Sequence, residues 1–198
     1  MNQALGNLIG AGKPFSVKEA REKGVSYALL SHYCQDGRLS RLCRGVYAPL
    51  ETTENSMPEI TALLSKGTEF VVCLLSALRL HDFTTQTPHE LWVAVRLGHK
   101  LPKLVDCPAP VCLQMSDEAY EYGIVHIERE GLKIPVYSAA KTVADAFKFR
   151  NKYGLDVALE ALREGLRLRK FTVNELEEAA RVCRMDNVMR PYMEMMLI

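Results

Sequence analysis

Two short helical segments, each with its own capping residue, lie close together near the N-terminus. Ser16 and Glu19 have the spacing of a capping box, in which the hydroxyl and the carboxylate each accept a backbone amide. Gly24 suits the left-handed end of that helix. Ser26 is a second N-cap residue, for a helix over residues 27–36. Two helices joined by about three residues, with a glycine in the turn, predict a helix-turn-helix.

The segment after the second helix has the pattern of a short β-hairpin. Leu39 and Leu42 bracket polar residues, and Gly45 permits a tight turn before a strand-forming Val-Tyr dipeptide. Together with a short helix at about residues 2–11, this pattern predicts a winged helix over residues 1–50. In that fold the second helix of the pair enters the DNA major groove, and arginines of the hairpin contact phosphates.

The second helix of the pair has one apolar and one polar face. Leu30, Tyr33 and Cys34 recur at helical spacing and predict the buried face. On the other face, Gln35 is suited to pair with adenine, but the set as a whole does not define a DNA sequence. The residues that we expect to bind DNA are Ser26, Tyr27, Ala28, Ser31, His32, Gln35, Arg38, Arg41 and Arg44.

Charge is distributed unevenly along the chain. Residues 1–50 have seven basic and three acidic side chains, a net charge of +4. The other 148 residues have 18 basic and 21 acidic side chains, so the net charge of the whole chain is only +1. A basic segment on a mildly acidic remainder favours contact between the N-terminal segment and nucleic acid.

The chain lacks the patterns of a membrane or secreted protein. The longest apolar run, Phe70 to Leu75, is much shorter than the roughly 20 residues of a membrane-spanning helix. No basic stretch leads into an apolar core at the N-terminus, as it does in a secretory signal. We therefore expect a cytoplasmic protein without membrane contact, and no disulfide framework among its six cysteines.

A polar segment without periodicity, residues 51–57, is predicted to be a linker between two domains. The second domain is then residues 58–198. Pro58 suits the first turn of a helix, and the apolar segment over residues 71–81 predicts a second, largely buried helix.

Strands follow these helices. The apolar run at 91–95 and the segment at 111–115 are predicted strands, and the alternation over 125–136 predicts a hairpin. From Ser138 the period becomes helical, which predicts four helices. The fold class is therefore α+β: an N-terminal winged helix-turn-helix, then a larger domain with a small mixed β-sheet and C-terminal helices.

Motifs of enzymes are absent from the sequence. There is no Gly-Ser dipeptide of a nucleotidyltransferase, no phosphate-binding P-loop and no GxGxxG. Glu130 and Lys133 straddle a turn and do not match the Glu-x-Lys of restriction-type nucleases. Histidines and cysteines do not have metal-ligand spacing. We expect no catalytic residues, no cofactor and no metal.

Charged residues of the C-terminal helices permit two interpretations. Lys141 and Asp145 lie at i and i+4, which predicts a surface ion pair that contributes about 0.3–0.5 kcal/mol. A basic cluster on the next helix predicts a solvated face. The alternative is a functional patch for antitoxicity, partner docking or a second DNA-backbone contact. Its candidate residues are Lys141, Asp145, Arg150, Arg163 and Arg167.

Several segments resemble, in the expected order, one protein family. Three lie in the N-terminal region: Lys23–Ser26, Gly37–Leu39 and Arg44–Tyr47. Two lie in the second domain: Ser76–His81 and the more specific Val136–Arg150. The sequence resembles the AbiEi-type antitoxin and transcriptional regulator family, which belongs to type IV toxin–antitoxin systems of abortive infection.

The resemblance implies a prokaryotic regulator that binds inverted repeats of double-stranded DNA in its own promoter. It also implies repression of an operon that encodes a nucleotidyltransferase-like toxin, which is neutralised without a stable complex. Symmetric half-sites require either a weak homodimer or monomers that bind side by side. We expect a sequence-specific, autoregulating transcriptional repressor. Two alternatives stay open: a protein-interaction module whose N-terminal domain docks a protein partner, and a DNA-targeted enzyme with an unrecognised catalytic domain.

Overall fold

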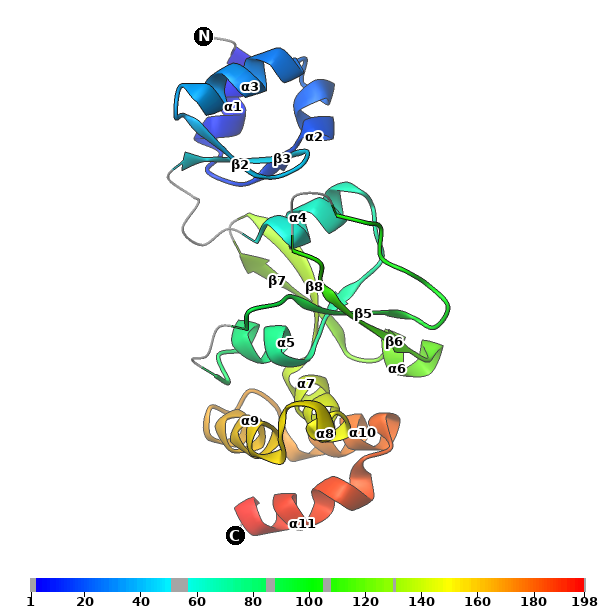
Figure 1. The fold of residues 1–198 in the computed structure, drawn as a ribbon. Coiled ribbons are helices and arrows are strands. Elements are labelled where there is room, and N and C mark those ends of the chain that lie inside the picture. The colour runs from blue at the N-terminus through cyan, green and yellow to red at the C-terminus, as the bar shows by residue number, and fades with distance from the viewer. Residues whose placement is uncertain (1–2, 51–56, 85–87, 105–107, 130, 198) are drawn as a thin grey trace. The chain divides into compact units, whose positions relative to one another are not determined.

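The computed structural model describes residues 3–50, 57–84, 88–104, 108–129 and 131–197 (Figure 1). The chain forms two compact units. The first contains Met1–Glu69, Leu101–Pro110 and Glu128–Ile134, and the second contains Phe70–Lys100, Val111–Ile127 and Pro135–Ile198. The protein is mixed α and β, with helices after a mixed sheet, in agreement with the predicted α+β class.

The first unit has four helices and a small antiparallel sheet among its described residues. Its elements are α1 (Gln3–Gly10), β1 (Phe15–Ser16), α2 (Val17–Glu22), α3 (Tyr27–Gln35), β2 (Leu39–Cys43), β3 (Val46–Pro49) and α4 (Pro58–Ser65). The sheet order is β1-β3-β2, and both pairings are antiparallel. The two predicted helices and the hairpin are confirmed as elements, whereas strand β1 was not predicted.

Local capping explains why the helix pair forms where it does. The Ser16 hydroxyl accepts the amide of Glu19 at 3.1 Å, and the Ser26 hydroxyl accepts the amide of Leu29 at 3.3 Å. Gly24 has φ of +79°, which ends the first helix and redirects the chain into the second. The caps read from the sequence are therefore the ones that define α2 and α3.

Two apolar clusters hold the first unit together. The larger one joins α1, the helix pair and the sheet through Leu5, Leu8, Phe15, Ala20, Val25, Leu30, Tyr33, Leu39 and Tyr47. In the smaller one, Ala62 of α4 packs with Cys43 and Val46 of the hairpin. Helix α4 therefore supports the hairpin from the side.

The predicted domain boundaries, 1–50 and 58–198 with a linker at 51–57, stay a prediction. Residues 51–56 lie outside the described residues. Helix α4 follows the predicted linker but belongs to the first compact unit, because Ala62 fills the apolar gap against the hairpin.

The second unit is built on a five-stranded mixed sheet in the order β6-β5-β4-β8-β7. Its strands are β4 (Val71–Val72), β5 (Trp92–Arg96), β6 (Val111–Met115), β7 (Ile124–Arg129) and β8 (Leu132–Tyr137), the last two reaching into residues of the first unit. Strand β4 is antiparallel to β5 and parallel to β8, and β5 is parallel to β6. The predicted strands and the mixed character of the sheet are confirmed.

The helices of the second unit are α5 (Leu74–Leu80), α6 (Asp117–Glu121), α7 (Ala139–Lys148), α8 (Arg150–Tyr153), α9 (Leu155–Arg167), α10 (Val173–Cys183) and α11 (Asp186–Leu197). The helix predicted over 71–81 is wrong at its start, because Val71 and Val72 pair with β5 as strand β4. Among the described residues five helices, not four, follow the sheet, because Gly154 with φ of +101° separates a short α8 from α9.

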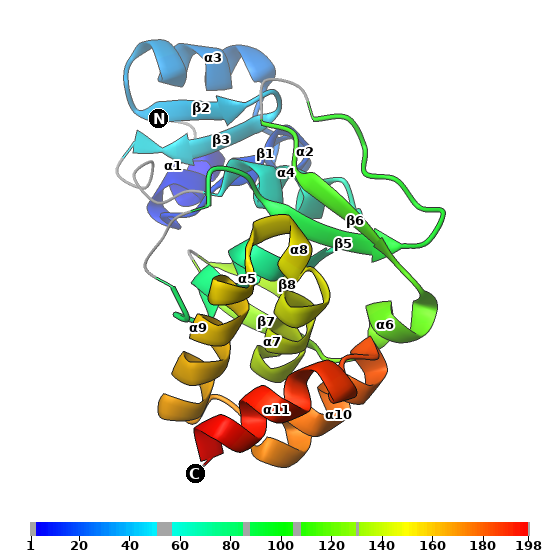
Figure 2. The ribbon, with the colours of Figure 1, turned by 60° about the horizontal axis from the view of Figure 1, so that its bottom comes forward.

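Helix α7 is the centre of the second unit. All of its residues except Lys148 are buried. It packs against α5, α9, α10 and α11 (Figure 2). A helix covered on all sides buries its polar residues together with its apolar ones, which determines the surroundings of Lys141 and Asp145.

Cys43, buried at the end of β2, is disulfide-bonded, although the sequence led us to expect no disulfide framework. Cys34, Cys73, Cys112 and Cys183 are free.

In the described part of the chain, no helix has both the length and the apolar character that crossing a bilayer requires.

Candidate nucleic-acid interface

Helix α3 presents the polar face that the sequence predicted. Tyr27, Ala28, His32 and Gln35 are exposed, and Ser31 is half-buried. The opposite face is covered: Leu30 and Tyr33 are buried in the core of the first unit, and Cys34 is half-buried against it. The exposed face of α3 is therefore accessible to a groove of DNA, while its role in base readout stays a prediction.

The N-terminal end of α3 is suited to an anion. Ser26 is exposed and caps the helix, and the first turn contains no acidic residue. The free amides and the dipole of a helix N-terminus favour a negative charge. Tyr27, the first residue of the helix, is 56% exposed. Further along the helix, His32 Nδ1 lies 3.6 Å from Asp36 Oδ1.

The hairpin places three arginines near this helix. Arg38, Arg41 and Arg44 are exposed. The guanidinium of Arg38 lies over the ring of Tyr33, 5.5 Å from its centroid, and this contact orients the side chain at the end of α3. Within the described part of the chain, Arg44 has no ion pair.

Arg41 lies close enough to α3 and β3 to influence groups on both. Burial raises the pKa of the Tyr47 phenol, and a hydrogen bond with Tyr27 raises it further, whereas the charge of Arg41 lowers it. Burial also raises the pKa of the Cys34 thiol, and Arg41 again opposes the shift.

A hollow of about 490 Å³ joins these elements. It is lined by Val17, Tyr27, Arg41, Arg44, Gly45 and Lys66. Three of these side chains are cationic, and none of the described residues that line the hollow is acidic. The sequence therefore identified three of its polar lining residues, Tyr27, Arg41 and Arg44, but missed Lys66. Lysines are common at helix C-termini because their charge interacts favourably with the helix dipole. Nothing in the sequence therefore distinguished Lys66 as a residue of the hollow.

Lys141 and Asp145 are not where the sequence placed them. Their side chains are 0% and 1% exposed, and Lys141 Nζ lies 2.6 Å from Asp145 Oδ2. The expectation of a surface ion pair is wrong, because helices and strands cover α7 on every side. A docking patch on the surface cannot include either side chain.

The buried pair belongs to a larger polar network. The Cys183 thiol donates to Asp145 Oδ1 at 3.3 Å, and Lys141 Nζ lies 4.3 Å from the centroid of the Tyr137 ring. The Tyr137 hydroxyl donates to the carbonyl of Tyr120 at 3.0 Å. Burial, and then the neighbouring carboxylate, raises the pKa of Cys183 to about 12, so this thiol is not a nucleophile at neutral pH.

The other residues of the predicted patch are arginines in different settings. Arg150 is half-buried and donates to the carbonyl of Phe147 at 2.8 Å. Arg163 and Arg167 are exposed on α9. Arg167 binds Glu164, with Nη2 2.6 Å from Oε2, and this contact lowers the pKa of Glu164. Of the predicted patch, only Arg163 and Arg167 are exposed, and Arg167 is already paired with Glu164.

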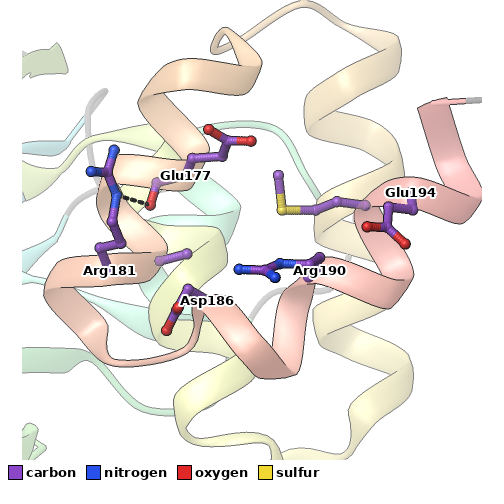
Figure 3. A pocket seen from close by; sticks show the side chains of 7 residues that line it. Glu177, Arg181, Asp186, Arg190 and Glu194 are labelled. Atoms are coloured by element: carbon purple, nitrogen blue, oxygen red, sulfur yellow. Dashed lines mark hydrogen bonds between the residues drawn. The ribbon is translucent and has the colours of Figure 1, made fainter.

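A second hollow, of about 340 Å³, lies between α10 and α11 (Figure 3). Its lining residues are Glu177, Ala180, Arg181, Asp186, Arg190, Met193 and Glu194. Figure 3 shows the Arg190 side chain extending into the hollow. Three acidic and two basic side chains neutralise most of each other's charge, so this hollow does not attract a polyanion.

The described residues contain no group of three or more His, Cys, Asp or Glu arranged to hold a metal ion. Of the two hollows described above, the one beside α3 is lined, among the described residues, by cationic side chains without a carboxylate, which favours an anion.

A comparison with known families finds a match in the N-terminal part of the chain. Residues 2–87 match the family model of the AbiEi antitoxin N-terminal domain, described as a transcriptional regulator. The match covers α1 to α5 and thus both the helix pair and the hairpin. The resemblance read from the sequence is confirmed over these residues. No curated protein matches the chain.

Proposed function

We propose that this protein, whose residues 2–87 match the AbiEi antitoxin N-terminal regulators, is a sequence-specific DNA-binding repressor that controls its own operon. The observation that carries the proposal is the exposed face of α3 beside a cationic hollow of the hairpin. The order helix, strand, two helices and hairpin, with a three-stranded sheet, supports a winged helix as the DNA-binding domain.

In this proposal α3 enters the major groove and the hairpin follows the backbone. Residues near the N-terminus of a recognition helix lie closest to base edges, which assigns base contacts to Tyr27, Ala28 and Ser31. His32 and Gln35 extend that surface by one turn. Arg41 and Arg44 contact phosphates, which fix the register of the protein on DNA but do not read the sequence.

The match to this family supports the operon context that we propose. The protein is the antitoxin of a prokaryotic, abortive-infection type pair and acts in the cytoplasm, without catalysis. It binds inverted repeats as a weak homodimer or as monomers side by side, and it counters a nucleotidyltransferase-like toxin without a stable complex. In the second unit, Arg163 and Arg167 are the exposed residues available for an additional backbone contact, since Lys141 and Asp145 are buried.

A gel-shift titration of the full chain tests the proposal. The probe is the DNA upstream of its own coding region, with scrambled duplex as competitor. We expect selective binding to the upstream duplex. Arg44→Ala should weaken binding both to this duplex and to the scrambled duplex, which serves as a second probe. Arg190→Ala is the matched control, because Arg190 is also exposed but lies among acidic side chains. His32→Ala and Gln35→Ala should change the preference between the probes more than the affinity for either.

Point variants are preferable to removing residues 1–50. Such a deletion separates Ala62 of α4 from Cys43 and Val46 and exposes an apolar surface. Equal binding of both probes by the full chain would argue against sequence-specific repression, and no binding of either would favour a protein-docking role for the N-terminal unit.

A further inference from the structure

The hollow beside α3 has one cation that comes from neither the helix pair nor the hairpin. Lys66 is the C-cap residue of α4, and its exposed side chain lines the hollow with Arg41 and Arg44. Building on the function proposed above, we infer that Lys66 binds a phosphate group of the DNA backbone together with these two arginines. The DNA-binding surface then extends beyond the helix pair and hairpin to α4.

The position of Lys66 is fixed by packing. Ala62, one turn earlier in α4, is buried against Cys43 and Val46 of the hairpin. The Lys66 amide donates to the carbonyls of Ala62 and Leu63 at 3.3 and 3.2 Å, which closes the helix. Helix α4 therefore presents its last residue at a defined place beside the hairpin rather than on a separate linker.

The ammonium group of Lys66 retains donors for a ligand. Its Nζ donates to the carbonyl of Lys103 at 3.0 Å, which uses one of its three N–H groups. Among the described residues it has no carboxylate partner. A neutral carbonyl orients the side chain without cancelling its charge, so a residue that lines the hollow keeps its positive charge.

The charge around the hollow selects the ligand. Arg41, Arg44 and Lys66 are cationic, and Tyr27 adds a hydroxyl. An arginine presents a planar fork of N–H donors, and a lysine presents a compact point charge; both suit a phosphate. The hollow between α10 and α11 differs in this respect, since its arginines face three acidic side chains.

DNA is the source of phosphate that fits the surrounding surface. Tyr27, which lines the hollow, is also the first residue of α3. A phosphate bound here lies next to the helix that faces the groove. Free phosphate has no second group to engage α3, and we therefore assign the site to the nucleic-acid backbone.

The test is a salt titration of the full chain on the upstream duplex, followed by fluorescence anisotropy. Lys66→Gln keeps a donor for the Lys103 carbonyl but removes the charge. The slope of log K against log salt is negative, and each lost phosphate contact reduces its magnitude by about 0.9. We expect this change for Lys66→Gln. Lys66→Arg should retain the wild-type slope. Lys148→Gln, at the exposed end of α7, is the matched control and should not change the slope.

The outcomes separate this inference from the proposed function. Salt-dependent binding by the wild type, with an unchanged slope in Lys66→Gln, would overturn the role of Lys66 alone. Absence of DNA binding by the wild type would overturn the proposed function as well. Inorganic phosphate is added at matched ionic strength as a separate arm. Displacement of DNA beyond that caused by chloride, abolished in Lys66→Gln, would assign the hollow to free phosphate and overturn the backbone assignment.

Discussion

Removal of one partner of the buried Lys141–Asp145 pair should strongly destabilise the second unit. The two charged atoms are 2.6 Å apart and essentially inaccessible to water. At an effective dielectric constant of about 20, their attraction is roughly 6 kcal/mol. Desolvation costs several kcal/mol for each ion and offsets most of this gain. The pair therefore contributes little net stability, but an isolated buried charge retains the desolvation cost without the attraction.

We expect Asp145→Ala and Lys141→Met each to lower the free energy of unfolding by about 3–5 kcal/mol. Asp145→Asn, which preserves size, should also be destabilising because Lys141 loses its counter-charge. The double variant Lys141→Met with Asp145→Leu should be close to wild type, or up to about 4 kcal/mol more stable. The non-additivity of the cycle measures the coupling between the two residues.

Urea unfolding monitored by tryptophan fluorescence is a suitable assay. The chain has a single tryptophan, Trp92, which lies in β5 of the second unit and contacts the Tyr153 ring edge-on at 6.4 Å between centroids. Its signal therefore reports the unit that contains the pair. If Asp145→Ala lowers the free energy of unfolding by less than about 1 kcal/mol, the effect is no larger than that expected for an exposed i,i+4 pair. That result would refute burial of the pair in solution.

Three further predictions concern single groups. Ser26→Ala should lower the free energy of unfolding by about 1 kcal/mol, because the Leu29 amide loses its capping hydroxyl. Thermal unfolding followed by circular dichroism measures this effect, and an unchanged melting temperature would contradict it. Burial, partly opposed by a bond to a backbone carbonyl, lowers the pKa of His81 below its ordinary 6.5. Because the unfolded chain then binds more protons, this contribution to stability is present above pH 6.5 and is lost as pH falls through the folded pKa. His81→Gln should flatten that dependence in urea unfolding at several pH values, and an unchanged slope would argue against it. Cys183, with a pKa near 12, should resist alkylation in the native protein while exposed Cys112 reacts, as read by mass spectrometry of the modified peptides; equal labelling would show that Cys183 is accessible.

The local features of the first unit were predictable because their causes are local. The serine caps define α2 and α3 within a few residues, and the alternation after α3 defines the hairpin. Strand β1, Phe15–Ser16, is too short to show any periodicity, and it exists because it pairs with β3. The start of the predicted helix at 71–81 is wrong for the same reason: Val71 and Val72 are apolar in either structure, and pairing with β5 decides between them.

Burial of charged residues was not predictable from spacing. Lys141 and Asp145 have the same i,i+4 spacing as surface pairs, but α5, α9, α10 and α11 pack against their helix and the pair is buried. The role of Lys66 likewise depends on packing of α4 against the hairpin. In both cases residues distant in the sequence contribute to the surroundings of the charge, so the i,i+4 spacing alone does not show whether the charge is buried.

The proposed function depends most on whether Arg41 and Arg44 of the hairpin bind DNA. The direct measurement compares the salt dependence of DNA binding by the full chain with that of the Arg41→Ala, Arg44→Ala double variant on the upstream duplex. Since each phosphate contact contributes about 0.9 to the slope, the double variant should lose about 1.8 while retaining the fold. A double variant that binds with the wild-type slope and affinity would contradict the proposed interface.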